Sequence, residues 1–157
     1  VRTHEKALVW DVMPWGVPIR VAGKRPGTTV KKFVTNVRNL ASPFWRANLE
    51  DPAHRCLVPF TQFAEPKPGK DAKTGRPAQY WFRVVDQPVA AFAGIWRETD
   101  IGRVFAVLTC EPNPLIAPLH PKAMPVILHP TDYASWLAGD SAQDLAVPFP
   151  SQLMILI

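Results

Sequence analysis

The stretch "VAAFAGIWRETDIGRVFAVLTC", residues 89–110, decides the class of fold. It holds two apolar runs rich in alanine, valine and aromatic residues, and a short segment with aspartate and glycine separates them. Such runs are typical of strands, and such segments are typical of turns. Upstream, "RCLVPF" (55–60) and "AQYWFRVVD" (78–86) have the same character. We therefore expect four successive strands of one sheet or barrel.

The composition favours one domain with more strand than helix. The 157 residues are 47% hydrophobic and 20% charged, which is a globular balance in a chain long enough to bury a core. Eighteen prolines remove backbone donors and interrupt helices. We predict a single domain over residues 1–157 of the β-rich α+β class, with a barrel-like mixed or antiparallel sheet and a few short helices.

Two short helices have local signals at their ends. "SPFWRANLE" (42–50) starts with Ser42 as the N-cap, and a proline follows at the first helical position. This helix should end at the Asp-Pro step that comes next. "PTDYASWLAG" (130–139) has Thr131 as a cap, Gly139 as a stop and apolar residues at helical spacing between them.

The N-terminal segments and the C-terminal tail are less regular. "ALVWDVM" (7–13) and "TTVKKFVTN" (28–36) are strand-like, whereas "PWGVPIRVAGKRPG" (14–27) is rich in turn residues and positive charge. We interpret the latter as a basic loop between strands. The tail "SQLMILI" (151–157) is too apolar to stay exposed to water, so it should form an edge strand of a sheet.

Charge and cysteine content limit the functional classes. A net charge of +5 favours a polyanionic partner, although many basic proteins bind none. Two cysteines exclude a disulfide-rich scaffold, and no apolar run is long enough for a membrane helix. The chain has neither the layout of a signal peptide nor the spacings of zinc or mononucleotide sites. We expect a cytoplasmic protein with no membrane span, no metal and no cofactor.

The cysteines and one glutamate raise the first question of chemistry. Cys56 and Cys110 both lie in strand-like apolar runs, where a cysteine is usually a small buried hydrophobe. Glu65, in "FTQFAEP" (60–66), stands beside aromatic residues that would raise the pKa of its carboxyl and suit it to donate a proton. The alternative is a solvated turn residue.

Other candidate residues come from three further stretches. His120 follows a proline-rich turn that could hold its ring in a cleft, or it is a surface histidine. Asn36 and Arg38 are two residues apart on a predicted strand, so their side chains would lie on the same face. That face is either functional or simply exposed to solvent. Trp15 precedes several basic residues, Arg20 among them, and this mixture suits base stacking beside phosphate contacts. Aromatic residues of the core next to a solvated basic loop explain this mixture nearly as well.

In order along the chain, these pieces resemble the SOS-response-associated peptidase (SRAP) family. Several spaced motifs over most of the chain are more specific than any one of them. The stretches that carry the resemblance are "MPWGVP" (13–18), "TNVRNL" (35–40), "SPFWRA" (42–47), "RCLVPFTQFAEP" (55–66), "FAGIW" (92–96), "FAVLTCEPN" (105–113) and "APLHPKAMPVILHPTDYASWL" (117–137).

The resemblance implies a compact, β-rich fold with a basic cleft for single-stranded DNA and strand junctions. It also implies covalent crosslinking to abasic sites, through a cysteine exposed at the N-terminus when the protein's own peptidase activity removes the initiator methionine. The amine and the thiol of that cysteine condense with the sugar aldehyde to a thiazolidine. Both groups ionise near neutral pH, so both are partly available as nucleophiles.

The family's roles can be carried over residue by residue. Asn36 would orient the reactive N-terminus, and Arg38 would bind the phosphate next to the lesion. Glu65 would act as acid or base on the sugar and the amine, while His120 would assist ring opening, Schiff-base chemistry and reversal. We expect Trp15, Arg20 and Lys122 to contact DNA as well.

The sequence also departs from the family. It starts at Val1 rather than at a reactive cysteine, so we expect that an N-terminal segment is missing. Ala123 stands where the family usually has arginine, leaving Lys122 to supply charge without a guanidinium. Ala64 and Pro66 replace aromatic residues that would flank Glu65.

Together these observations predict a DNA-damage-response protein of bacterial or phage-related origin, associated with the nucleoid and monomeric. It would bind single-stranded or abasic-site DNA, crosslink to it and process its own N-terminus. The alternatives are a degenerate relative that binds nucleic acid without chemistry, and a globular protein whose basic charge only keeps it soluble.

Overall fold

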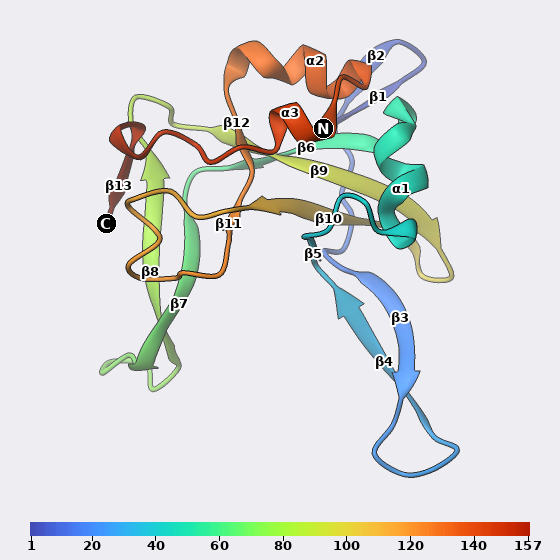
Figure 1. Ribbon diagram of the computed structural model, residues 1–157, viewed down its shortest axis with the longest axis horizontal. Coiled ribbons are helices and arrows are strands. Elements are labelled where there is room, and N and C mark those ends of the chain that lie inside the picture. The colour runs from blue at the N-terminus through green and yellow to red at the C-terminus, as the bar shows by residue number, and fades with distance from the viewer.

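The computed structural model describes residues 1–157 and contains three β-sheets (Figure 1). The main sheet has eight strands in the order β11-β10-β9-β6-β1-β2, with β12 paired to β9 and β5 paired to β10. All its pairs are antiparallel except β5 with β10. Its strands are β1 (Arg2–His4), β2 (Ala7–Val9), β5 (Asn36–Val37), β6 (Arg55–Phe60), β9 (Ala90–Thr99), β10 (Gly102–Cys110), β11 (Met124–Pro125) and β12 (Ile127–Leu128).

The second sheet explains why no barrel forms. Its order is β13-β8-β7, with β7 at Phe63–Lys70, β8 at Pro77–Val84 and β13 at Met154–Leu156. The β-rich α+β class is confirmed, and so is the edge strand in the tail. The predicted barrel is wrong, because β8 leaves the β6-β9-β10 sheet and pairs with β7 and β13 instead, so the main sheet stays open.

The third sheet is a separate hairpin of β3 (Val17–Ala22) and β4 (Thr29–Val34), which projects from the body in Figure 1. The predicted basic loop over residues 14–27 is therefore wrong. Proline and positive charge suggested a loop, but an isolated two-stranded hairpin has free edges that accommodate both. The strand predicted for residues 7–13 is also shorter, because it ends at Val9.

The helices are short, and they are α1 (Pro43–Glu50), α2 (Tyr133–Ala138) and α3 (Ala142–Leu145). The Ser42 hydroxyl accepts a hydrogen bond from the Phe44 amide, which confirms the predicted N-cap of α1. Gly139 ends α2 with a left-handed φ of 97°, as predicted. Thr131 is not the cap, because a turn of 3-10 helix over Pro130–Asp132 precedes α2. No helix has the length and apolar character to cross a membrane.

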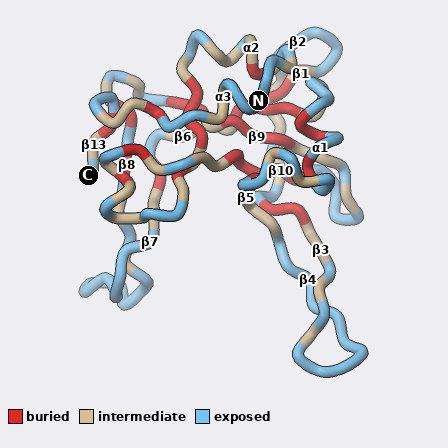
Figure 2. Tube along the Cα trace, viewed as in Figure 1, coloured by how far each residue is buried: buried red, intermediate tan, exposed pale blue.

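Two hydrophobic cores lie on opposite faces of β9. Ala91, Ala93 and Ile95 belong to the core under α1 and α2, whereas Ala90 and Phe92 face the core shared with β7 and β8. This alternation explains the unbroken apolar run of β9, since both of its faces are buried. Figure 2 shows the buried residues in the middle of the main sheet and almost none in the β3-β4 hairpin.

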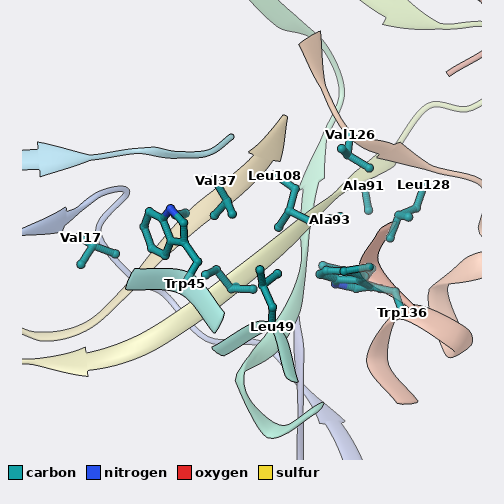
Figure 3. Close-up of a cluster of buried hydrophobic side chains, with 14 of the residues drawn as sticks. Val17, Val37, Trp45, Leu49, Ala91, Ala93, Leu108, Val126, Leu128 and Trp136 are labelled. Carbon is teal, nitrogen blue, oxygen red and sulfur yellow. The ribbon is translucent and has the colours of Figure 1, made fainter. Parts of the chain in front are cut away.

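The first core is filled by large side chains from the helices against small ones from β9 (Figure 3). Trp136 of α2 is fully buried, and its indole N–H donates to the Cys56 carbonyl at 2.9 Å. Trp45 and Leu49 of α1 are also buried. Burying one large apolar side chain stabilises a fold by about 1.5–3 kcal/mol. This core therefore fixes β9 and β10, which contribute residues to the cleft described next.

Candidate functional site

A cleft of about 450 Å³ opens between β7, β10 and the segment that leads into β11. It is lined by both apolar and polar side chains. Four residues singled out in the sequence line it: Trp15, Asn36, Glu65 and His120. They come from four separate segments of the chain, so the fold brings together residues that are far apart in sequence.

Two of these residues, Trp15 and Asn36, are held in place by backbone pairing with β10. Asn36 lies opposite Val107 in the parallel pairing of β5 with β10. Trp15 bridges to Phe105, and the Phe105 amide donates to the Pro14 carbonyl at 3.1 Å. The Trp15 indole N–H donates to the Thr35 carbonyl at 3.0 Å, while 57% of the residue stays exposed. The tryptophan is thus fixed at its polar end and open at the rim of the cleft.

Glu65 lies on β7, opposite Tyr80 of β8. Only 13% of its side chain is exposed. Burial disfavours the carboxylate and raises the pKa of Glu65, and a positive charge on His120 would act in the opposite direction. The carboxyl therefore holds its proton to higher pH than an exposed glutamate, which is the property a proton donor needs.

His120 is held by a turn that Asn113 organises. The Asn113 side-chain oxygen accepts from the amides of Leu115 and Ile116, and the amide of His120 donates to the Ile116 carbonyl at 2.8 Å. The ring atom Nδ1 lies 2.9 Å from the Ala123 carbonyl oxygen and 3.1 Å from Glu65 Oε2. This turn agrees with the prediction that a proline-rich segment places the ring in a cleft.

These contacts define the tautomer of His120. A carbonyl oxygen can only accept, so Nδ1 carries the hydrogen. In the neutral ring Nε2 is then free to accept a proton. The pair can therefore offer a proton from Glu65 and take one at His120, while the Asn36 amide can hold a polar group in place.

The three remaining predicted residues lie outside the cleft lining. The Arg38 guanidinium donates to the Lys122 carbonyl, which ties the segment after β5 to the segment after His120. Both side chains are exposed beside the cleft. Arg20 lies on β3, exposed and opposite Lys31. Their roles in binding DNA stay predictions.

Both cysteines lie in strands, as the sequence predicted. Cys56 is buried on β6, and Cys110 is half-buried at the end of β10. Burial raises the pKa of each thiol to about 12. Neither residue lines the cleft.

Sequence reasoning missed several polar and aromatic residues of the cleft, namely Gln62, Gln79, Trp81 and Thr109. Trp81 had a usable signal, because it alternates with the fully buried Phe82 and is 38% exposed. Thr109 follows Val107 at the two-residue spacing of one strand face. The two glutamines had no such signal. No group of three or more histidine, cysteine or acidic residues is arranged to hold a metal ion.

Comparisons with known proteins place this geometry in context. The model of the family described as "SOS response associated peptidase (SRAP)" matches residues 1–156. No curated protein matches the chain. Several solved structures are similar in fold, and three of them are described below.

A protein from Bacteroides thetaiotaomicron is 24% identical with a TM-score of 0.63, covering 77% of this chain and 56% of its own. A protein from Bordetella bronchiseptica is 21% identical with a TM-score of 0.62, covering 77% of this chain and 63% of its own. A phage-related protein from the same organism is 20% identical with a TM-score of 0.61, covering 98% of this chain and 72% of its own. The chain thus spans less than two thirds of the length of the first two.

Proposed function

This chain belongs to the SOS response associated peptidase (SRAP) family, and from that premise we propose that it binds single-stranded or abasic-site DNA in the cleft of Glu65 and His120. The observation that carries the proposal is the 3.1 Å contact between these two side chains. A mostly buried carboxyl beside an imidazole is an acid-base pair, and such pairs gather at functional sites. Trp15 at the rim offers a flat surface on which a base can stack.

We propose further that a form of the protein beginning with cysteine crosslinks to the abasic sugar. The α-amine adds to the aldehyde carbon, and loss of one water gives an imine. The thiol then adds across the imine, its sulfur to the carbon and its proton to the nitrogen, and closes a thiazolidine. Glu65 would give the departing hydroxyl its proton, and His120 would take the proton that the amine loses. Removal of a preceding methionine by the same site would expose the cysteine.

A second candidate function is noncovalent binding of nucleic acid without chemistry. It is favoured by the altered surroundings of Glu65, where Ala64 and Pro66 supply no aromatic wall, and by Ala123 in place of a cation. It is also favoured because both thiols in the chain lie outside the cleft. The two candidates share the DNA-binding cleft and differ in the covalent step.

One experiment separates them. The natural full-length protein, with its N-terminus identified by mass spectrometry, is incubated with a labelled single strand that carries one abasic site and with its intact counterpart. An adduct that survives denaturation with the abasic strand alone supports crosslinking. Salt-sensitive binding without an adduct supports the second candidate. If neither strand binds at low salt, both candidates fail.

Matched variants test the roles of the two side chains. Glu65→Gln and His120→Gln should each slow adduct formation about 10²–10⁴-fold, the usual contribution of a positioned acid or base. Glu98→Gln and His4→Gln change the same residue types at exposed positions outside the cleft and should leave the rate unchanged. Equal rates in all four variants would contradict the proposed acid-base roles.

A further inference from the structure

The positive charge of this protein is concentrated in one segment. Residues 12–49 contain seven of the 18 lysines and arginines and none of the 13 acids. The rest of the chain carries the other eleven cations against all thirteen acids, so the whole positive excess lies in this segment. Five of the seven cations belong to the β3-β4 hairpin and its tip, namely Arg20, Lys24, Arg25, Lys31 and Lys32.

The hairpin emerges directly from the cleft. Trp15, just before β3, and Asn36, just after β4, both line it. In Figure 1 the hairpin extends away from the main sheet, and Figure 2 shows β4 and the tip exposed while β3 is partly covered. A ligand that occupies the cleft therefore has this hairpin next to it.

The base of the hairpin is fixed to β10. The Gly16 amide donates to the Phe105 carbonyl at 2.8 Å, and the Val107 amide donates to the Thr35 carbonyl at 3.0 Å. Gly16 has a φ of 117°, and a Cβ there would lie 2.9 Å from the Phe33 Cβ. Only glycine suits this close approach. The hairpin thus leaves the body in a set direction, which lowers the entropy lost when it binds.

The side chains of the hairpin repel one another in the free protein. Arg20 and Lys31 are directly opposite in the register, a placement that destabilises a strand pair. Lys31 reaches one acid, the exposed Asp100 at 3.6 Å, and the other four cations form no ion pair. Phe33 is 53% exposed on the same face as Arg20 and Lys31. Unpaired cations with an exposed aromatic ring suit phosphates and bases.

We propose that the β3-β4 hairpin is an arm that binds the sugar-phosphate backbone flanking the nucleotide in the cleft. The inference rests on the proposed function, since it needs DNA in the cleft. At about 3.3 Å per residue, the six residues of β3 extend about 20 Å. One strand of duplex DNA presents about six phosphates over that length. The arm thus enlarges the binding footprint beyond the cleft.

The test neutralises the arm and compares it with an equal change elsewhere. The arm variant combines Arg20→Gln, Lys24→Gln, Arg25→Gln and Lys32→Gln. The control variant combines Lys6→Gln, Lys70→Gln, Lys73→Gln and Arg76→Gln, which are also exposed and unpaired. Thermal unfolding checks that both variants fold, and affinity is measured for intact DNA of different lengths over a salt series.

For a single strand of about 20 nucleotides, the arm variant should bind at least about tenfold more weakly at low salt. The slope of log affinity against log salt should fall by about 0.7 for each lost phosphate contact on a single strand. An oligonucleotide of about four nucleotides, the low end of known site sizes, should bind both variants and the natural protein alike. A junction of single and double strand, compared with the single strand, identifies which kind of backbone the arm contacts.

Several results would overturn the proposal that the β3-β4 hairpin binds the DNA backbone. They are an unchanged affinity for the long strand, an equal loss on short and long strands, or an equal loss in the control variant. Loss of binding to anionic lipid vesicles without loss on DNA would assign the hairpin to a membrane instead. If Asn36→Ala weakens DNA binding while the arm variant does not, the proposal for the hairpin fails and the proposed binding of DNA in the cleft stands. If the natural protein binds no DNA, the proposed function fails, and the arm with it.

Discussion

His120 Nδ1 lies 3.1 Å from Glu65 Oε2 and 2.9 Å from the Ala123 carbonyl oxygen. One N–H therefore faces two acceptors, and the carbonyl keeps the ring in place whether Glu65 is protonated or not. The second ring nitrogen remains available for a substrate. The carboxyl, mostly buried, is the partner whose charge the surroundings disfavour. The two side chains are thus suited to opposite directions of proton transfer.

Glu65→Gln should change how stability depends on pH. The folded-state pKa of Glu65 lies above its ordinary value of 4.5, so the fold binds a proton that the unfolded chain releases. The resulting stabilisation is present below pH 4.5 and is lost as the pH rises through the folded-state pKa. Glutamine has no such loss. The free energy of unfolding of the variant, relative to the natural protein, should therefore be higher at pH 7 than at pH 4.

Urea unfolding at both pH values measures this difference. Glu50→Gln serves as the control, because that glutamate is exposed, forms no ion pair and lies outside the cleft, and the change with pH should be larger for Glu65→Gln than for this variant. A relative stability of Glu65→Gln that falls between pH 4 and pH 7 would contradict the raised pKa.

The two cysteines should be inert in the folded protein. Both thiols have a pKa of about 12, so almost no thiolate exists at pH 7.5, and the thiolate is the nucleophile. Iodoacetamide should label neither residue before unfolding, as intact-mass spectrometry can follow. A Cys56→Ala, Cys110→Ala variant should keep any DNA adduct that the natural protein forms. Rapid labelling of the native state, or loss of the adduct in a folded variant, would contradict this.

Arg55→Met should destabilise the protein by about 1–3 kcal/mol for each buried carbonyl that is left unpaired. The buried guanidinium donates to the carbonyls of Leu49, Trp136 and Asp140, at or just after the ends of α1 and α2. It also lies 4.3 Å from the centre of the Trp136 ring. Methionine fills space but leaves the Leu49 and Asp140 carbonyls without a donor, whereas the Trp136 carbonyl still accepts from the Gly139 amide.

Chemical denaturation gives the free energy of unfolding of Arg55→Met, and the exposed Arg83→Met is the matched control. The control should change stability by less than about 0.5 kcal/mol. A loss under about 1 kcal/mol in Arg55→Met would mean that water replaces the guanidinium at the helix ends.

The elements with local signals were predictable from the sequence. Ser42 and the proline after it mark the start of α1, and the long apolar run of β9 marks a strand buried on both faces. β3 and β7 were not predictable, because their prolines resemble loop signals until a partner strand is known. That the main sheet does not close into a barrel was not predictable either, because closure depends on which strands pair with β8.

The candidate site was predictable in its members but not in its geometry. Local patterns left Glu65 between a proton donor and a turn residue, and the family resemblance supplied the reason to group it with Asn36 and His120. The contact with His120, and the bracing of Arg38 against Lys122, arise from tertiary packing of distant segments. Arg55 had no signal at all, because only the converging ends of two helices bury it.

The hairpin of β3 and β4 also has an evolutionary consequence. Its strands pair only with each other, so a change in their length does not shift the pairing of the strands in the main sheet. Residues can be added or deleted beyond the fixed base at Gly16 and Thr35 without moving Trp15 or Asn36. A change of two residues per strand keeps the side chains beyond the change on their faces, whereas a change of one residue would invert those side chains. Insertions and deletions in steps of two are therefore the changes that descendants of this protein can tolerate in the hairpin.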